Sequence, residues 1–533
     1  MKKRVIYLLL IIIAFTTCYK ASYSYNTFNE NNIPVYDGVM YEKNQIRAYF
    51  QYKDNFSLKE RINQVIYEFQ RNPINPGFNC VIALINPKWF INDYDIMIRS
   101  FLATFIFSLV LVRFLRNRTS DINKLLIIAL IFQLPLFYHY RYGLGTYVPE
   151  ISSALFLLSG YLLILIFFST EKKWQLMIGL VLMSISIMFR FNFFVYASAL
   201  LLPLFYSSIS ILRKKGKWEL IYFSSFGLLL LGFVFVYVLS KLSFFLGYYN
   251  HPVPYQKFYL KNCLIGIIDD WRVDIGLIGL LVFLIVWILS NEEKLTNQKK
   301  MTNFYLCYPY LFFIGFIYLY INATNTPHVA AAVMVFIFPI FIIPSKLLNF
   351  IYTKLNRRVL QIASIIIIVF LNVNFFTSCK KLETISDEYK VPKKVINDII
   401  QIKNLDEGFK YFCFFEEMEE YPIDVAVHKK TGVWLGTKDV FYFHDSGFYG
   451  ISKDLDTKTC TNFYIDKILE GKHDLIAINK TANIPMKGQK NAILISRNIR
   501  KFIVHNKNYK KVKTILNLYH GEVEFYKRKG SKY

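Results

Sequence analysis

Residues 151–169 read ISSALFLLSGYLLILIFFS, a run without a charged side chain. A helix of about 20 apolar residues is long enough to cross the hydrocarbon core of a bilayer. Lys172 and Lys173 follow closely, which is typical of a cytoplasmic boundary. The stretch therefore predicts a transmembrane helix, and similar apolar blocks occur before and after it along the chain.

The composition also favours a membrane protein. Of the 533 residues, 54% are hydrophobic and 19% are charged, and the apolar residues gather in blocks instead of short amphipathic stretches. The net charge of +26 fits basic cytoplasmic loops and a basic outer domain, and it favours contact with anionic lipid phosphates. No nucleic-acid-binding motif accompanies this charge, so no nucleic-acid partner is expected.

The N-terminus predicts an uncleaved first span with its start in the cytoplasm. Met1-Lys2-Lys3-Arg4 precedes an apolar run from Val5 to Thr17, and no small-residue cleavage site follows. Because Lys and Arg concentrate in cytoplasmic loops, the basic segments orient the later spans. About eleven spans are expected in total. The later ones are placed at 97–112, 125–138, 151–169, 175–211 (two spans), 219–241, 274–290, 304–321, 329–345 and 359–376.

The sequence therefore predicts a polytopic α-helical membrane protein with a small extracytoplasmic α/β C-terminal domain. Residues 1–376 form the transmembrane domain, with a long outer loop at 18–96, and residues 377–533 form the soluble domain. Short apolar runs in the tail predict strands, with helical stretches between them. The expected strands are Tyr411–Phe415, Val440–Phe443, Leu475–Ile478 and Ala492–Ile495, and one expected helix is Lys393–Lys403.

Acidic side chains in the first outer loop are the first candidates for chemistry. Asp37 and Glu42 lie in the segment PVYDGVMYE at residues 34–42. Carboxylates near a membrane face are costly unless they are used or well hydrated. One of them can act as a general base toward an acceptor hydroxyl or amine. The alternative, which the bare residues favour, is a solvated aspartate at the end of a turn.

Four segments further along the chain are also candidates for function. They are Asn75-Pro76-Gly77, Arg99 at the entry to the second span, Glu150 at the end of the outer turn 139–150, and Phe189-Arg190-Phe191-Asn192. Together with Asp37, Tyr41 and Glu42, they resemble the GT-C superfamily of membrane glycosyltransferases. That family includes the protein O-mannosyltransferases and the aminoarabinose transferases that modify lipid A. The resemblance covers roughly residues 1–345, with Phe191 in place of the family's proline.

The resemblance implies an inverting glycosyl transfer from a polyprenyl-phosphate sugar donor to a glycan, lipid or protein acceptor. Asp37 would deprotonate the acceptor, and Glu150 would orient the acceptor or bind a divalent cation together with Asp37. No cofactor is expected, although binding of a divalent cation remains an open alternative. Glu42, from the same acidic motif as Asp37, would bind substrate. Departure of the lipid phosphate requires positive charge nearby. The candidate cations are Arg141, Arg190, Lys257, Lys261, Arg272 and His328. Each of them alone is equally well explained as a residue that reaches toward the membrane interface.

Two other functions compete with this hypothesis. A flippase or transporter for lipid-linked glycans usually shows inverted repeats and charged, broken helices, whereas the predicted spans here are almost free of charge. A polysaccharide polymerase or ligase places its large outer loop late in the chain, whereas here the loop follows the first span. The expected location is the plasma membrane, with a cytoplasmic N-terminus and an extracytoplasmic C-terminal domain.

Overall fold

The computed structural model of the protein divides into two compact units. The first contains Met1–Tyr25 and Asn55–Ser378, and the second contains Asn26–Asp54 and Cys379–Tyr533. The residues that the structure describes are 3–29, 32–33, 42, 46, 57–71, 86, 88–91, 93–116, 120–139, 143–190, 193–240, 335, 357–379, 391–392, 397, 411–414, 425–430, 457–479, 490–518 and 521–531.

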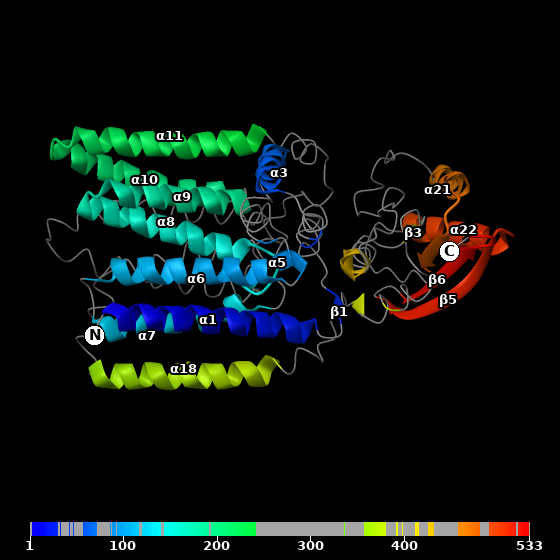
Figure 1. Cartoon of the computed structure of the whole chain (residues 1–533), viewed down its shortest axis with the longest axis horizontal. Helices are drawn as coiled ribbons and strands as arrows, with labels where there is room; N and C mark the ends of the chain where they lie inside the picture. Colours follow the sequence, from blue (N-terminus) through cyan, green and yellow to red (C-terminus); the bar gives the residue numbers. More distant parts are fainter. Residues whose placement is uncertain are drawn as a thin grey trace. The chain divides into compact units, whose positions relative to one another are not determined.

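The first unit is a bundle of long helices that run side by side (Figure 1). Within the described part of the chain, four are long and apolar enough to cross a membrane, over Lys3–Phe28, Tyr94–Phe114, Glu150–Phe168 and Trp218–Tyr237. The long helices are α1 (Lys3–Phe28), α6 (Tyr94–Phe114), α7 (Asp121–Ile131), α8 (Glu150–Thr170), α9 (Lys173–Phe189), α10 (Phe193–Lys214), α11 (Trp218–Ser240) and α18 (Arg357–Cys379). The shorter ones are α3 (Leu58–Arg71), α5 (Lys88–Ile91) and the 3-10 helix η1 (Pro135–Tyr138).

Helix α8 is the centre of the bundle core. Its residues from Ile151 to Phe167 are all buried, because an apolar helix with no polar face can be covered on every side by its neighbours. Helix α9 packs antiparallel against it, and the Ser186 hydroxyl donates a hydrogen bond to the Ser153 carbonyl at 2.8 Å. This pair of helices positions the residues at the two ends of the bundle.

Small residues allow α8 and α9 to approach closely. A Cβ atom added to Gly160 would lie 2.5 Å from the Gly179 carbonyl oxygen. Gly160→Ala is therefore expected to lower the free energy of unfolding by about 1–3 kcal/mol, because an added methyl group overpacks the contact. The measurement is thermal or denaturant unfolding of the purified protein in detergent.

Gly232 of α11 provides the matched control for this prediction. It also lies within an apolar helix, but no described atom lies within 4 Å of an added Cβ. Gly232→Ala is therefore expected to leave stability unchanged or to raise it by up to about 1 kcal/mol, since alanine favours the helix. Equal effects of the two substitutions would contradict the close contact between α8 and α9.

Most predicted spans in the described part of the chain coincide with helices to within a few residues. Two differ. The first span was expected to end at Thr17, whereas α1 continues to Phe28 and includes the start of the predicted outer loop. The third was expected at 125–138, whereas α7 ends at Ile131 and η1 forms a separate turn with Pro135 in its first turn. The expected spans 274–290, 304–321 and 329–345 lie outside the described residues, except Val335.

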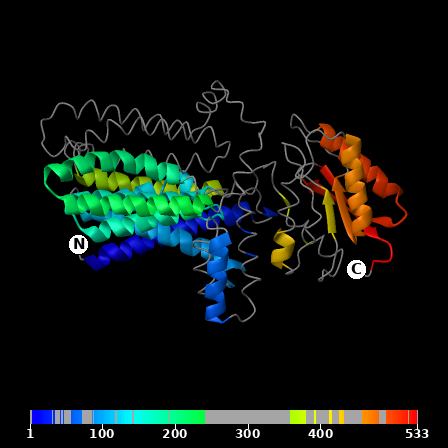
Figure 2. The ribbon, with the colours of Figure 1, turned by 90° about the horizontal axis from the view of Figure 1, so that it is seen from above.

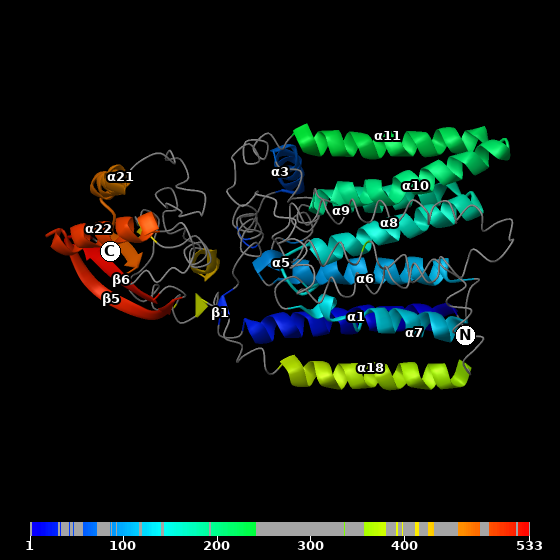
Figure 3. The same ribbon diagram turned by 180° about the vertical axis from the view of Figure 1, so that it is seen from behind.

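One end of the bundle, where α8 is followed by α9 and α10 by α11, is rich in Lys and Arg, and we call it the basic end. Figures 1 and 3 show the helices that meet at this end. The long helices alternate in direction, so α6, α8 and α10 end there while α7, α9, α11 and α18 begin there. Because the helices alternate in this way, the Lys- and Arg-rich segments between them lie at the same end, as the positive-inside rule predicts for one side of a membrane. The basic residues of this end include Arg113, Lys124, Lys173, Arg213, Lys217 and Arg358.

The second unit contains a four-stranded mixed sheet with two helices on one face (Figure 2). The strand order is β3-β4-β6-β5, with β3 and β4 parallel and the other pairs antiparallel. The elements are β3 (Tyr411–Phe414), β4 (Leu475–Asn479), β5 (Tyr509–Leu518), β6 (Gly521–Arg528), α21 (Thr457–Gly471) and α22 (Lys490–His505). A separate two-stranded sheet pairs β1 (Asn32–Ile33) with β2 (Val391–Pro392).

The two helices bury apolar side chains against the sheet. Tyr464 and Ile468 of α21 and Ile499 and Ile503 of α22 pack on the face that carries Ile476. Those residues recur at helical spacing, so each helix has one apolar side and one side left for water. The core therefore fixes which side of α22 faces outward.

The strands predicted in the tail are partly correct. The runs Tyr411–Phe415 and Leu475–Ile478 correspond to β3 and β4. The strand predicted at Ala492–Ile495 is wrong, because these residues belong to α22. A short apolar run does not distinguish a strand from a buried helix side. The expected strand at 440–443 and helix at 393–403 lie outside the described residues, except Asn397.

Candidate functional site at one end of the helix bundle

The end of the bundle opposite the basic end, which we call the site end, contains a buried ion pair. Glu150 is the first residue of α8, and Arg190 directly follows the last residue of α9. Because α8 and α9 form an antiparallel pair, these two residues come together although 40 positions separate them. The Arg190 guanidinium donates to the Glu150 carboxylate, whose side chain is 0% exposed, whereas Arg190 is 21% exposed.

The start of α8 is a favourable place for this carboxylate. The unpaired backbone N–H groups of the first helical turn give it a partial positive charge, which stabilises an anion. Arg190 adds a full positive charge at the same point. Burial of a carboxylate is otherwise costly, and these two neighbours offset that cost.

Arg99 holds the loop that leads into α8. It lies in the second turn of α6 and is only 4% exposed. Its guanidinium donates to the carbonyl of Thr146 at 2.6 Å and to that of Tyr147 at 3.3 Å. The neighbouring Ser100 hydroxyl donates to the Leu144 carbonyl at 2.5 Å. Because Arg99 is buried and hydrogen-bonded to backbone carbonyls, it acts on Glu150 by fixing the backbone before it.

The same loop contacts α1 and the start of α6. A Cβ atom on Gly145 would lie 2.4 Å from the backbone of Ala21, so only glycine allows this approach. The Tyr147 hydroxyl donates to the Asp93 carboxylate at 2.5 Å. Asp95, in the first turn of α6, is 1% exposed and lies within electrostatic reach of Arg99 and Asp93. The site end therefore holds several charged groups out of water.

A buried lysine lies near the carboxyl-terminal end of α1. Lys20 is 1% exposed and donates to the Gln133 side-chain oxygen at 2.9 Å. Its ammonium group also lies 4.1 Å from the ring centre of Tyr138 and 4.6 Å from that of Phe375. Aromatic faces attract a cation in this geometry. Lys20 thus connects α1, η1 and α18 at this part of the bundle.

The charges at the site end differ in what they can do. Arg99 and Lys20 are almost completely buried, so they position the backbone and the helices. Arg190 keeps part of its surface exposed and is the described cation best placed to contact an anionic ligand. Glu150 can hold Arg190 in one orientation or accept a hydrogen bond from a ligand.

The predicted site residues fall into three groups. Glu150 and Arg190 are brought together as described above. Glu42 lies in the second unit, where Lys429 donates to its carboxylate at 2.9 Å, so its role in substrate binding stays a prediction. The others, Asp37, Arg141, Lys257, Lys261, Arg272 and His328, lie outside the described residues.

Two buried charged residues, Lys20 and Asp95, were not singled out from the sequence. The spans were expected to be almost free of charge, but Lys20 lies in α1 and Asp95 lies in α6. Both were assigned to the outer loop, because apolar runs alone set the ends of the spans. A charged residue next to an apolar run is the signal that could have identified them.

No model of a known protein family matches the sequence, and no curated protein matches it as a relative. In the part of the chain that the structure describes, no three His, Cys, Asp or Glu side chains come together as a metal site would require.

Proposed function

We propose that this protein is a membrane glycosyltransferase of the GT-C type. It transfers a sugar from a polyprenyl-phosphate donor to a glycan, lipid or protein acceptor at the outer face of the plasma membrane. The observation that carries the proposal is the ion pair of buried Glu150 with partly exposed Arg190 at the end of the bundle opposite the basic residues. A structural helix pair does not require a buried carboxylate there, whereas a site for a lipid phosphate does require an oriented cation.

The proposed reaction is a single displacement. Asp37 removes a proton from the acceptor, whose oxygen or nitrogen forms a bond to the anomeric carbon while the bond from that carbon to the phosphate oxygen breaks. The polyprenyl phosphate leaves with the bonding electron pair, so negative charge grows on its oxygen. Arg190 stabilises that charge, and Glu150 orients Arg190. Arg141, Lys257, Arg272 and His328 are further proposed phosphate contacts, and Glu42 is a further proposed substrate-binding residue.

The apolar helices and the basic end support the membrane location. Four described helices are long and apolar enough to span a bilayer. Because the basic end would face the cytoplasm, the site end would face outward, where lipid-linked sugars of this kind are used. The N-terminus is then cytoplasmic, and the second unit lies outside the cell.

A donor-transfer assay tests the proposal. Purified protein receives a polyprenyl-phosphate sugar with a labelled sugar, together with membrane extract as the source of acceptors. We expect the label to appear in a new glycosidic product and free polyprenyl phosphate to accumulate in equal amount. Donor that is not consumed would contradict the proposed transferase.

A flippase for lipid-linked glycans is the second candidate, and one observation favours it. Lys20 and Asp95 are buried charges in helices that were expected to be nearly uncharged, and such residues often mark a transport path. Proteoliposomes loaded with the same donor separate the two functions. Movement of intact donor across the membrane without formation of a glycosidic bond would favour the flippase.

A further inference from the structure

The outward side of α22 in the second unit presents a mixed apolar and basic stripe. Leu494, Arg497, Lys501 and Val504 recur at steps of three and four residues, so they lie on one side of the helix. All four are exposed, Leu494 at 46% and Val504 at 50%. Ile499 and Ile503 occupy the opposite side, in the core. We call these four residues the α22 stripe.

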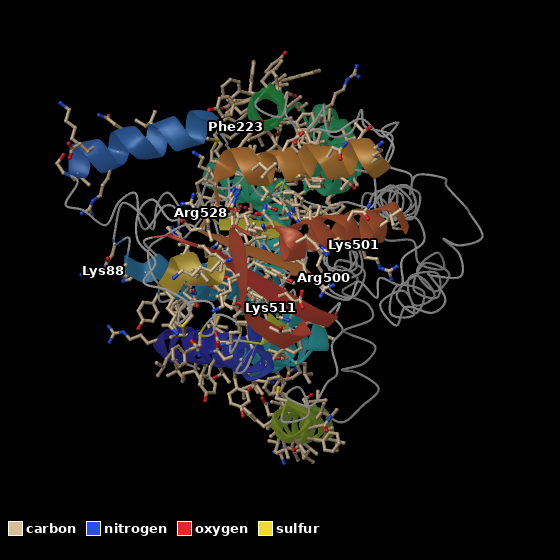
Figure 4. The ribbon with its side chains drawn as sticks, turned by 90° about the vertical axis from the view of Figure 1, so that its right-hand side faces the viewer. Lys88, Phe223, Arg500, Lys501, Lys511 and Arg528 are labelled. Carbon is tan, nitrogen blue, oxygen red and sulfur yellow. The ribbon has the colours of Figure 1, made fainter. Side chains whose placement is uncertain are left out.

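The charge around the stripe is one-sided. Helix α22 contains basic residues but no Asp or Glu. Glu524 of the adjacent sheet forms ion pairs with Arg500 at 2.7 Å and with Lys511 at 2.8 Å. Figure 4 labels Arg500 and Lys511 together with Lys501 of the stripe. Burial alone would raise the pKa of Glu524, but hydrogen bonds from Arg500, Lys511 and Tyr526 outweigh it and lower this pKa to about 2. Glu524 therefore stays ionised, and its charge offsets part of the charge of Arg500 and Lys511. The positive charges of the stripe itself attract an external anion.

The apolar members of the stripe indicate what kind of anion it meets. A soluble polyanion would contact Arg497 and Lys501 but would gain nothing from exposed Leu494 and Val504. A bilayer surface uses both, because basic groups contact headgroup phosphates while apolar side chains enter the acyl boundary. The longer stretch of this unit, Cys379–Tyr533, directly follows the apolar helix α18 in the chain, so the unit is covalently joined to a helix that is expected to span the bilayer.

We propose that the α22 stripe docks the second unit on the anionic phospholipid headgroups of the bilayer in which the bundle lies. Arg497 and Lys501 contact the phosphates, and Leu494 and Val504 insert between the headgroups. This proposal does not depend on sugar transfer, because it rests on the surface of the second unit alone.

The test uses the full chain in nanodiscs of phosphatidylcholine with or without phosphatidylglycerol. A photoreactive benzophenone amino acid replaces Val504, and lipid adducts are quantified by peptide mass spectrometry after illumination. We expect adducts with phosphatidylglycerol and far fewer with phosphatidylcholine alone. Arg497→Gln/Lys501→Gln should lower the docking equilibrium by roughly fivefold for each cation removed.

Two control variants separate charge at the stripe from general charge and from folding. Arg497→Lys/Lys501→Arg keeps the charge and should keep the adducts. Lys458→Gln/Lys472→Gln removes two exposed basic residues of the α21 segment and should also keep them. Equal adducts in both lipids, no adducts, or an undiminished yield in the Gln variant of the stripe would overturn the proposal. Binding of polyphosphate to the stripe in detergent, without lipid adducts, would also overturn it in favour of a soluble polyanion.

Discussion

An Asp37→Asn protein is expected to lose about 10²- to 10⁴-fold in the rate of sugar transfer while its fold and donor binding stay intact. Asparagine keeps the size and hydrogen-bonding shape of the side chain but cannot accept the proton of the acceptor. The loss should therefore appear in kcat, because deprotonation occurs in the transition state. The measurement is transfer of labelled sugar from the polyprenyl-phosphate donor by purified protein.

Asp121→Asn is the matched control for this substitution. Asp121 lies at the start of α7, at the basic end, and forms an ion pair with Lys124 at 3.0 Å. The Asp121→Asn protein should transfer sugar at the wild-type rate, because residue 121 lies at the end of α7 that is far from the site end. Equal turnover by wild-type protein and Asp37→Asn would remove Asp37 as the base. Loss of turnover in both variants would indicate a general effect of lost negative charge.

Glu150→Gln is expected to lower the free energy of unfolding by about 3 kcal/mol, because it leaves the Arg190 guanidinium beside a neutral group in a largely buried place. Complete burial of both partners would place the cost at up to about 5 kcal/mol, but Arg190 is 21% exposed and keeps some contact with solvent. The measurement is denaturant unfolding in detergent, followed by tryptophan fluorescence.

The other end of the same helix supplies the control for Glu150. Glu171 follows α8 at the basic end and pairs with Lys217, and these side chains are 31% and 38% exposed. Exposed ion pairs contribute at most about 1 kcal/mol, so Glu171→Gln should have a small effect. Equal destabilisation by the two substitutions would show that burial does not distinguish them.

A double substitution separates stability from function at this pair. Glu150→Gln/Arg190→Gln removes both charges, so it should recover much of the stability that Glu150→Gln alone loses. Sugar transfer should nevertheless stay low, because the cation proposed to stabilise the leaving phosphate is absent. Recovery of both stability and transfer would reduce the pair to a structural role.

Long apolar helices were the part of this fold that the sequence predicted best. The spans at 97–112, 151–169 and 219–241 correspond to α6, α8 and α11 within a few residues, because an apolar run of this length allows few other structures. The end of α1 was missed, since Lys20 interrupts the apolar run although aromatic rings bury it. Helix α22 was missed because a short apolar run fits a helix as well as a strand.

The pairing of Glu150 with Arg190 was not predicted, although both residues were. Each was assigned from its position in the chain, and Arg190 was expected to contact the donor phosphate. Only the antiparallel packing of α8 and α9 shows that the two side chains meet. The roles of Arg99 and Asp95 likewise depend on burial, which a single sequence does not reveal.

The second unit draws residues 26–54 and 379–533 from two distant stretches of the chain, and this affects its biosynthesis. During translation the early stretch leaves the ribosome long before the late one exists. Strand β1 then has no β2 to pair with, and Glu42 has no Lys429. A nascent chain halted before Cys379 should therefore display its early stretch to proteases and chaperones, and synthesis of the remaining residues should end that exposure.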